Sequence, residues 1–391
     1  MTRRPVIAAA KRTVFGRNRG SLSNVRPDDL LGETLQQLLA GAPNLDPSRI
    51  DDVIMGDANG AGEDNRNVAR MGALLAGLPT TVPGVTLNRL CGSGAEAMVQ
   101  AARAVRSGDM DIVIAGGVES MSRAPYVLPK PDRALDPGMG LEQTTVGWRM
   151  VNPKFPAHWT RSLGACAEST AARRDIGRDA QDAWALRSHQ RVAQAWAAGK
   201  HEGFAFTVGE LTRDECIRDD ATAASLAALK PAFTPDGSVT AGNSSPINDG
   251  AVATLVVDES LVDELGLEPI GAIVGAAVIA GEPDDFAAAP VPAMRKLLDR
   301  TGRSLDEIAL VEVNEAFAAV VLTVLHDMPD LDPQIVNVNG GAIAIGHPVG
   351  ASAARIVVDT CRELQRRGGG LGIATACIGV GLGIAILVEV P

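Results

Sequence analysis

Aromatic side chains are scarce in this sequence of 391 residues, and positive charge is in the minority. Phe, Trp and Tyr make up 3% of the chain, and 36 Lys and Arg stand against 47 Asp and Glu, a formal net charge of −11. Nucleic-acid coats and proteins of anionic membrane surfaces need an excess of cations, and base-stacking surfaces need aromatic rings. We therefore expect neither a nucleic acid nor a membrane among the partners of this chain.

The sequence also lacks paired cysteines. It has five cysteines, which is an odd number, and no CxxC pair occurs. This spacing argues against a disulfide framework and against a zinc site, and it is typical of proteins in a reducing compartment. The sequence predicts a cytoplasmic protein without a metal site.

One long uncharged run could be mistaken for a membrane span. Residues 368–388 contain no charged side chain, but the run is rich in glycine. Glycine weakens a helix by about 1 kcal/mol at each position. The run therefore predicts two short buried strands, residues 371–376 and 383–388, joined by a glycine turn.

Predicted strands and helices alternate in the same order at both ends of the chain. In the first half we expect strands at 5–10, 52–55, 84–88 and 111–115, and helices at 28–39, 68–75 and up to 106. In the second half we expect strands at 269–277, 309–313, 334–338 and 371–376, and helices at 292–300, 318–325 and up to 365. This alternation predicts α/β layers with buried sheets, and the matched order indicates an internal duplication.

Residues 121–240 interrupt this order. They contain all four tryptophans and the single tyrosine, and their 15 Lys and Arg nearly balance 14 Asp and Glu. A near-neutral insertion on an acidic chain could accept an anionic ligand. It could equally be a helical surface insertion without a ligand, and composition does not decide between the two.

The duplication places Cys91 and His347 at equivalent points, each between a predicted strand and a predicted helix. A thiol at a helix N-terminus meets the positive end of the helix dipole, which favours the nucleophilic thiolate. A histidine there could act as a general base toward Cys91, with a covalent acyl intermediate as the result. Taken singly, each residue would more often be structural, Cys91 as an inert buried thiol and His347 as a hydrogen-bonded imidazole.

Two further groups follow strands of the second half. Cys377 is expected in the glycine turn, where it could exchange a proton and where free glycine amides could hold an oxyanion. Asn314 ends another strand, at the edge where ligands of α/β sheets gather. Other chemistries find less support, because the sequence has no GxSxG, GxxxxGK[ST] or HExxH motif and no GxGxxG linked to a strand.

The combination resembles a known family. The blocks NRLCGSG, TAGNSSPINDGA, NEAFAA, GGAIAIGHPVGASAAR and CIGVGLG occur in this order and are similar to the blocks of thiolases over nearly the whole chain. The resemblance implies an α/β fold of five αβαβα layers, made of two βαβαβαββ halves with an inserted helical loop domain. It places the first half at 1–120 plus about 241–265, the CoA-binding loop domain at 121–240 and the second half at 266–391.

The resemblance also implies the role of each matching residue. Cys91 would take the acyl group, His347 would receive its proton, and Cys377 would exchange a proton with the α-carbon of acetyl-CoA. Asn314 would hold a water that stabilises the enolate oxygen together with His347. The backbone amides of Cys91 and Gly379 would hold the oxyanion of the acyl-enzyme.

On the coenzyme A side the resemblance assigns substrate contacts to a larger set of residues. They are Leu163, Arg218, Ser225, Ala232, Phe233, Ser245, Ala316 and Phe317. No cofactor is implied, since coenzyme A is a substrate.

Several positions depart from thiolases that act on acetoacetyl-CoA. Ser-Leu-Gly at 162–164 stands where many have His-Met-Gly, residues 286–290 replace a glycine-containing stretch, and Pro246 replaces a glycine. Conversely, AGEDNRNVARM, TTVGWRMVNP and CIGVGLG are similar to blocks of thiolases that act on 3-oxoadipyl-CoA.

The sequence thus predicts a degradative thiolase of the kind found in fatty-acid β-oxidation. It would cleave 3-oxoacyl-CoA with CoA to acetyl-CoA and a shortened acyl-CoA, reversibly. The substrate could be acetoacetyl-CoA, 3-oxoadipyl-CoA or a longer chain. A decarboxylating condensing enzyme and a non-catalytic CoA or lipid carrier are the less favoured alternatives. The resemblance implies a homodimer or homotetramer.

Overall fold

The computed structural model describes residues 3–131, 133–134 and 138–391, and its two halves have closely matched topologies. The first half contains β1 (Pro5–Thr13), β2 (Gly16–Arg17), α1 (Pro27–Ala40), β3 (Asp52–Gly56), α2 (Val68–Leu75), β4 (Gly84–Leu87), α3 (Ser93–Ser107), β5 (Ile112–Ser120) and β9 (Asn248–Asp258). The second half contains β10 (Gly271–Ala280), α8 (Pro290–Thr301), β11 (Ile308–Val313), α9 (Ala318–Asp327), α10 (Ala342–Ile345), α11 (Val349–Arg367), β12 (Gly370–Ile378) and β13 (Leu382–Val390). The helix α7 (Val262–Leu265) connects the halves.

The strands of both halves form one continuous sheet. Its order is β4-β3-β5-β9-β1 in the first half and β10-β13-β12-β11 in the second. The halves meet where β1 pairs antiparallel with β10, through Val6 with Ala272 and Ile7 with Gly271. In each half the last strand runs antiparallel between two neighbours, so the second half repeats the first in reverse spatial order.

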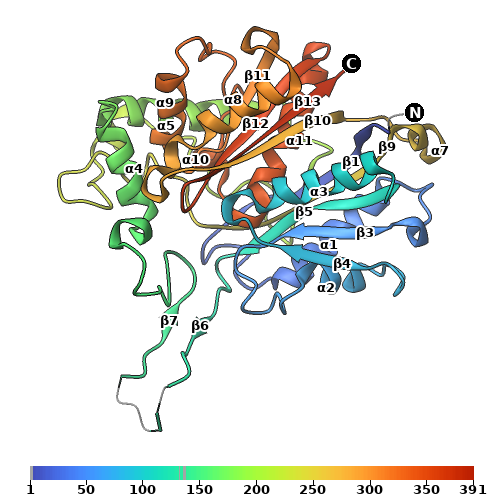
Figure 1. Ribbon diagram of the computed structural model, residues 1–391, viewed down its shortest axis with the longest axis horizontal. Coiled ribbons are helices and arrows are strands. Elements are labelled where there is room, and N and C mark those ends of the chain that lie inside the picture. The colour runs from blue at the N-terminus through green and yellow to red at the C-terminus, as the bar shows by residue number, and fades with distance from the viewer. Residues whose placement is uncertain (1–2, 132, 135–137) are drawn as a thin grey trace.

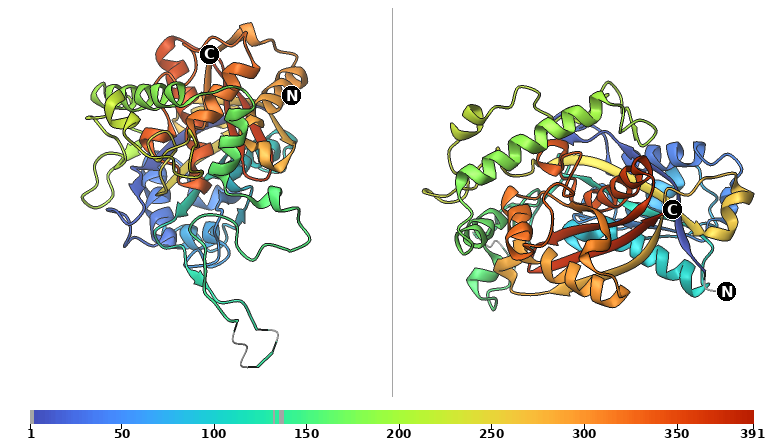
Figure 2. Two further views of the ribbon diagram at one scale, coloured as in Figure 1. Left: turned by 90° about the vertical axis from the view of Figure 1, so that its left-hand side faces the viewer. Right: turned by 90° about the horizontal axis from the view of Figure 1, so that it is seen from above.

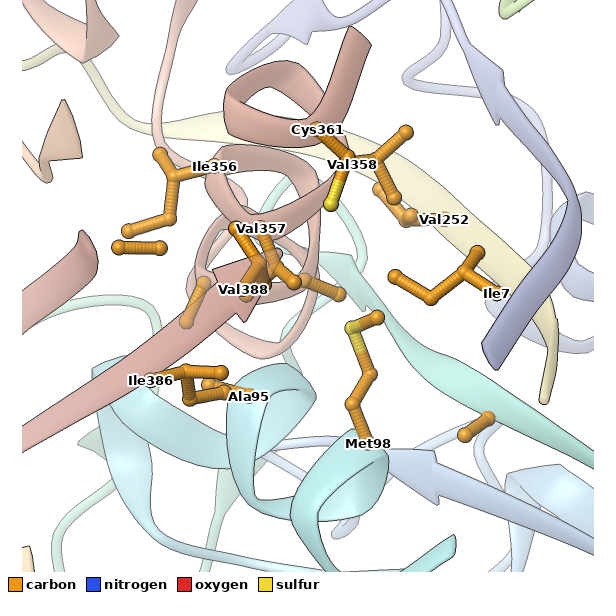
Figure 3. Packing of buried hydrophobic residues seen from close by; sticks show 14 of the residues in the cluster. Ile7, Ala95, Met98, Val252, Ile356, Val357, Val358, Cys361, Ile386 and Val388 are labelled. Carbon is orange, nitrogen blue, oxygen red and sulfur yellow. The ribbon is translucent and has the colours of Figure 1, made fainter. Parts of the chain in front are cut away.

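Two helices occupy the centre of the molecule. Helices α3 and α11 pack against each other, α3 also against β5 and α11 against β12, while α1 and α8 cover the outer faces. Figures 1 and 2 show the helices on both sides of the strands. In Figure 3 Met98 of α3 and Val357 of α11 lie in the core beside Val388 of β13, with Ile7 and Val252 close by. The two halves of the sheet form two β layers, with α3 and α11 between them and α1 and α8 on the outside. This arrangement confirms the predicted α/β class with five layers.

One predicted strand is absent from the second half. Residues 334–338 form no strand and make only a single bridge, Val336 to Val311. Asn337 has a left-handed φ of 46°, which breaks an extended ladder. Its side chain replaces the missing pairing, because Oδ1 accepts from the Val313 N–H at 2.7 Å and Nδ2 donates to the Val313 carbonyl at 2.9 Å.

The inserted residues are helical only in part. They contain α4 (Leu163–Ala172), α5 (Arg178–Ala197) and α6 (Ala223–Ala227), together with the short strands β6 (Tyr126–Val127), β7 (Glu142–Gln143) and β8 (Ala205–Phe206). Strands β6 and β7 pair with each other and lie on an arm that projects from the body (Figure 1, and the left view of Figure 2). Strand β8 joins the main sheet beside β1.

The uncharged run near the C-terminus forms the two strands that the sequence predicts. It supplies β12 and β13, which are buried along most of their length. Within the described ranges of the chain no helix is long and apolar enough to cross a membrane.

Candidate active site

Cys91 lies in a tight turn between β4 and α3. The turn is a 3-10 helix, Leu90–Gly92, and Leu90 has a left-handed φ of 48°. The Cys91 Sγ accepts a hydrogen bond from the Gly379 N–H, and only 8% of the residue is exposed. A Cβ on Gly92 would come within 2.4 Å of Ile378 Cδ1. Because residue 92 is glycine, the end of β12 can approach the turn that contains Cys91.

The Cys91 thiol is not ionised in the resting site. Burial raises the pKa of Cys91 to about 11, and hydrogen bonds from the amides of Gly379 and Cys91 itself only reduce that increase. The sequence-based expectation that the dipole of α3 favours thiolate is therefore wrong, because the pKa of Cys91 lies above its usual value. Loss of hydration outweighs the field of the helix terminus.

His347 precedes α11 and is held by two hydrogen bonds. Its N–H donates to Asn248 Oδ1 at 2.9 Å, and its Nδ1 lies 2.7 Å from Ser352 Oγ. The Ser352 hydroxyl donates to the Pro348 carbonyl at 2.8 Å, so it must accept from Nδ1–H. This places the lone pair of the neutral ring on Nε2. Burial, and then the charge of Arg355, lowers the pKa of His347 to about 4, so the ring is a neutral base.

Asn314 lies beside the free nitrogen of that ring. Its Nδ2 is 3.4 Å from His347 Nε2. Its Oδ1 is fully buried and has no hydrogen-bond partner among the described residues. A buried amide oxygen without a partner is suited to a bound water molecule.

Cys377 approaches the same place from the second half. It lies in β12 opposite Gly383, not in the turn where the sequence placed it. Burial, and then the negative charge that Cys91 would carry as a thiolate, hold the pKa of Cys377 well above its usual range. The turn that follows contains Gly379 and Val380, and Val380 has a left-handed φ of 59°, which is strained for a β-branched residue.

One cavity of about 220 Å³ unites part of the predicted site. Cys91, His347, Gly379, Leu163 and Ser245 all line it. Cys377 and Asn314 do not line the cavity. Each lies beside a residue that does, Cys377 beside Cys91 and Asn314 beside His347. The cavity therefore holds a thiol, a neutral imidazole and a backbone amide around one volume.

The other predicted substrate residues divide into two groups. Ala316 and Phe317 lie next to the lining residue Ser245, because the Ser245 N–H donates to the Ala316 carbonyl and Phe317 forms a bridge with Ser244. The Phe233 ring packs edge-on against Phe317 at 5.9 Å. Arg218, Ser225 and Ala232 are exposed and do not line the cavity. The Ser225 hydroxyl is engaged in the capping box of α6 with Thr222.

Sequence reasoning missed several residues of the site, including the following four. Ser352 sets the tautomer of His347, Asn248 holds its backbone, and Trp148 and Arg149 line the cavity. All four lie inside blocks that carry the resemblance. Nothing in their spacing, however, shows that their side chains meet Cys91 or His347.

Comparisons with known proteins decide the family. The model of the thiolase N-terminal domain matches residues 5–260, and that of the thiolase C-terminal domain matches residues 267–390. The chain belongs to the thiolase family. Its activity is the CoA-dependent cleavage of 3-oxoacyl-CoA.

Individual relatives cover the full length of this thiolase. It is 47% identical to the 3-oxoadipyl-CoA/3-oxo-5,6-dehydrosuberyl-CoA thiolase of Escherichia coli, with 97% of each chain covered. It is 46% identical to the beta-ketoadipyl-CoA thiolase of Pseudomonas knackmussii, with 100% of each covered. The crystal structure of human mitochondrial 3-ketoacyl-CoA thiolase in complex with CoA matches with a TM-score of 0.92 and 35% identity, covering 100% of this chain and 98% of the human chain.

Proposed function

We propose that this thiolase cleaves 3-oxoadipyl-CoA to acetyl-CoA and succinyl-CoA through an acyl group on Cys91. The observation that carries the mechanism is the single cavity lined by Cys91, His347 and Gly379. The choice of substrate rests on the names of its relatives from Escherichia coli and Pseudomonas knackmussii.

In the first half-reaction Cys91 attacks the 3-oxo carbon of the substrate. His347 Nε2 takes the thiol proton, and the amides of Cys91 and Gly379 hold the oxygen that becomes negative. The bond between C2 and C3 then breaks, and its electron pair forms the enolate of acetyl-CoA. Cys377 donates its proton to C2 of that enolate, while a water on Asn314 and the His347 ring stabilise the enolate oxygen.

In the second half-reaction CoA removes the acyl group. The CoA thiol gives its proton to the Cys377 thiolate and attacks the acyl carbon. The bond to Cys91 breaks, and its sulfur recovers the proton held by His347. Because the acyl group stays on Cys91 while acetyl-CoA leaves and CoA binds, acyl transfer follows ping-pong kinetics.

A thiolysis panel tests this function. We expect kcat/KM to be higher for 3-oxoadipyl-CoA than for acetoacetyl-CoA and for longer, uncharged 3-oxoacyl-CoA. The acyl-enzyme, trapped with 3-oxoadipyl-CoA in the absence of CoA, should carry a succinyl group on Cys91 in peptide mass spectra. A preference for acetoacetyl-CoA, or a group on another residue, would contradict the proposal.

The three-part division of the chain is also proposed, with residues 121–240 as the segment that meets CoA. Support comes from Leu163 and Trp148, which lie in this segment and line the cavity. Phe233 is half exposed beside Phe317, where it could contact the pantetheine chain. Phe233→Ala should raise the KM for CoA severalfold and change kcat little, whereas an unchanged KM would contradict this role.

We further propose a cytoplasmic homo-oligomer. The cytoplasmic location is supported by the five cysteines, which are all free, as is typical of proteins in a reducing compartment. Strand β4 pairs with β3 and ends the sheet, with Val85 on it 43% exposed. Tyr126 and Leu141 are exposed on the arm. An open edge strand and exposed apolar side chains are typical of contact surfaces. Light scattering should give a dimer or tetramer, and Val85→Glu should shift it toward monomer; a monomeric parent chain would contradict the proposal.

A further inference from the structure

We propose that Arg149 is the residue that selects dicarboxylic substrates, by binding the terminal carboxylate of the 3-oxoacyl chain. The inference rests on the proposed function and goes beyond it, because it assigns the recognition of the distal charge to one side chain.

Among the described residues that line the cavity, Arg149 is the one that carries a charge. The rest of the lining is mainly apolar, and its imidazole, His347, is neutral because burial lowers the pKa of that ring to about 4. The apolar part includes Leu90, Met121, Val146, Leu163, Ile247 and Val349. A site of this kind uses few polar groups to orient its ligand. The cation is thus the feature that distinguishes a charged chain end from an apolar one.

The guanidinium is held in place from one side. Its Nη2 donates to Asn59 Oδ1 at 2.8 Å. Asn59 Nδ2 in turn donates to the carbonyl and the hydroxyl of Thr144, at 3.0 and 3.2 Å. Both ends of the Asn59 amide are therefore occupied, which keeps its oxygen turned toward Arg149. Asn59 is a positioning residue for the cation.

The remaining donors of Arg149 are free to bind a ligand. Within the described part of the chain, Nε and Nη1 have no hydrogen-bond partner, and no carboxylate lies within 4.0 Å of the guanidinium. Arg12, by contrast, is fully buried and is paired with Asp214. Arg149 as a residue is half-buried. A carboxylate can accept two parallel N–H bonds from a guanidinium, and this pairing is stronger beside apolar side chains than in water.

The chemistry of the substrate keeps its charge in this cavity throughout the reaction. Attack at C3 of 3-oxoadipyl-CoA leaves a succinyl group on Cys91. Its free carboxylate is three carbon–carbon bonds from the thioester carbonyl. Because both Cys91 and Arg149 line one cavity of about 220 Å³, a group this short remains within that volume. The contact therefore acts in both half-reactions, and its loss lowers kcat/KM for the charged substrate.

Two substrates of equal length isolate the charge. 3-Oxoadipyl-CoA and 3-oxohexanoyl-CoA differ only in a terminal carboxylate or methyl group. For Arg149→Met we expect kcat/KM to fall about 10- to 100-fold with 3-oxoadipyl-CoA, the range typical of a hydrogen-bonded charge pair. With 3-oxohexanoyl-CoA it should stay within about twofold of the parent. For Arg149→Lys, kcat/KM with 3-oxoadipyl-CoA should lie between that of the parent and that of Arg149→Met. Lysine retains the charge but cannot donate two parallel hydrogen bonds to a carboxylate.

Two further variants separate local recognition from general effects. Lys154 is an exposed cation of the same segment and does not line the cavity. Lys154→Met removes the same charge and should leave the ratio of the two kcat/KM values unchanged. Asn59→Ala should lower that ratio in the same direction as Arg149→Met but less, because the cation remains and only its position is lost.

The outcomes distinguish this inference from the proposed function. If the parent enzyme does not prefer 3-oxoadipyl-CoA, the proposed substrate is wrong and the role of Arg149 fails with it. If the parent prefers it and Arg149→Met keeps that preference, only the role of Arg149 is overturned. An equal fall with both substrates also overturns it, because Arg149 would then contact coenzyme A or support the loop.

Discussion

The outer edges of the two halves differ, although the halves share one topology. The first half ends in a true strand, β4, which has an open side in the described structure. At the matching place the second half has residues 334–338, where the Asn337 side chain substitutes for strand pairing. Helix α5 covers this edge, since Arg187 and Arg191 donate to the Val336 carbonyl. An edge of a sheet must be paired, covered or left for another chain, and the duplicated halves use different solutions.

The reactive groups of the two halves differ in a similar way. Cys91 and His347 occupy matching turns, and burial acts on both, raising the pKa of one and lowering that of the other. Both groups therefore start neutral. Their distinct roles come from their partners, the Gly379 amide for the thiol and Ser352 for the imidazole. Topology sets where the groups lie, and their surroundings set what each can do.

Removing the nucleophile of the first half should have the largest effect. We expect Cys91→Ala to lower thiolysis by at least about 10⁴-fold, as for loss of a covalent nucleophile in other enzymes. Cys361→Ala removes another buried thiol, in α11, and should retain most of the activity. Thiolysis rates measured at equal folded protein test this. Near-parental turnover by Cys91→Ala would contradict the covalent mechanism.

The pH dependence of alkylation compares the two sulfurs directly. Iodoacetamide reacts with thiolate, and the thiolate fraction of Cys91 should rise about tenfold per pH unit below its pKa of about 11. In the free enzyme the labelling rate of Cys91 should thus rise about 1000-fold from about pH 7 to about pH 10. Cys377, more deeply buried and with its pKa well above normal, should label far more slowly. Peptide mass spectrometry gives both rates; a plateau near neutral pH would show that the resting residue is a thiolate.

Breaking the covered edge should cost stability. Glu315 is fully buried and accepts from Trp184 Nε1 at 2.9 Å, from Ser188 Oγ at 2.6 Å and from Asn337 Nδ2 at 2.9 Å. Glu315→Ala leaves these donors unpaired and should lower the free energy of unfolding by about 3 kcal/mol, more than 100-fold in the folding equilibrium. Urea denaturation measures it. The exposed Asp306 is a matched control, and a loss at Glu315 no greater than at Asp306 would show that this network does not hold the edge.

Loss of the tautomer contact should have the smallest effect of the four. Ser352→Ala removes the acceptor of His347 Nδ1–H, so the ring can turn or adopt the other tautomer. We expect kcat to fall about 10-fold while the free energy of unfolding changes by only about 1 kcal/mol. Ser352→Thr retains the hydroxyl and should recover part of the rate. Equal losses in both variants would indicate a packing defect in α11.

Much of the fold could be predicted from the sequence. Helix α2 has the predicted bounds, Val68–Leu75, because its apolar spacing and its Asn67 cap are local signals. Strand β9 was not predicted, and the strand at 334–338 was predicted wrongly. At 334–338 the side-chain amide of Asn337 takes the place of strand pairing, because it accepts a hydrogen bond from the backbone N–H of Val313 in β11. Local patterns do not contain such partners.

By itself, the sequence determined the alternation of strands and helices, the duplication, and the turns that carry Cys91 and His347. Those features depend on apolar periodicity, glycine and caps, which act over a few neighbouring residues. Only the tertiary structure decided the protonation states of the two groups, the tautomer of the ring and the presence of Arg149 in the same cavity. Each of these depends on desolvation and on contacts between segments far apart in the chain, and both arise only when the layers pack.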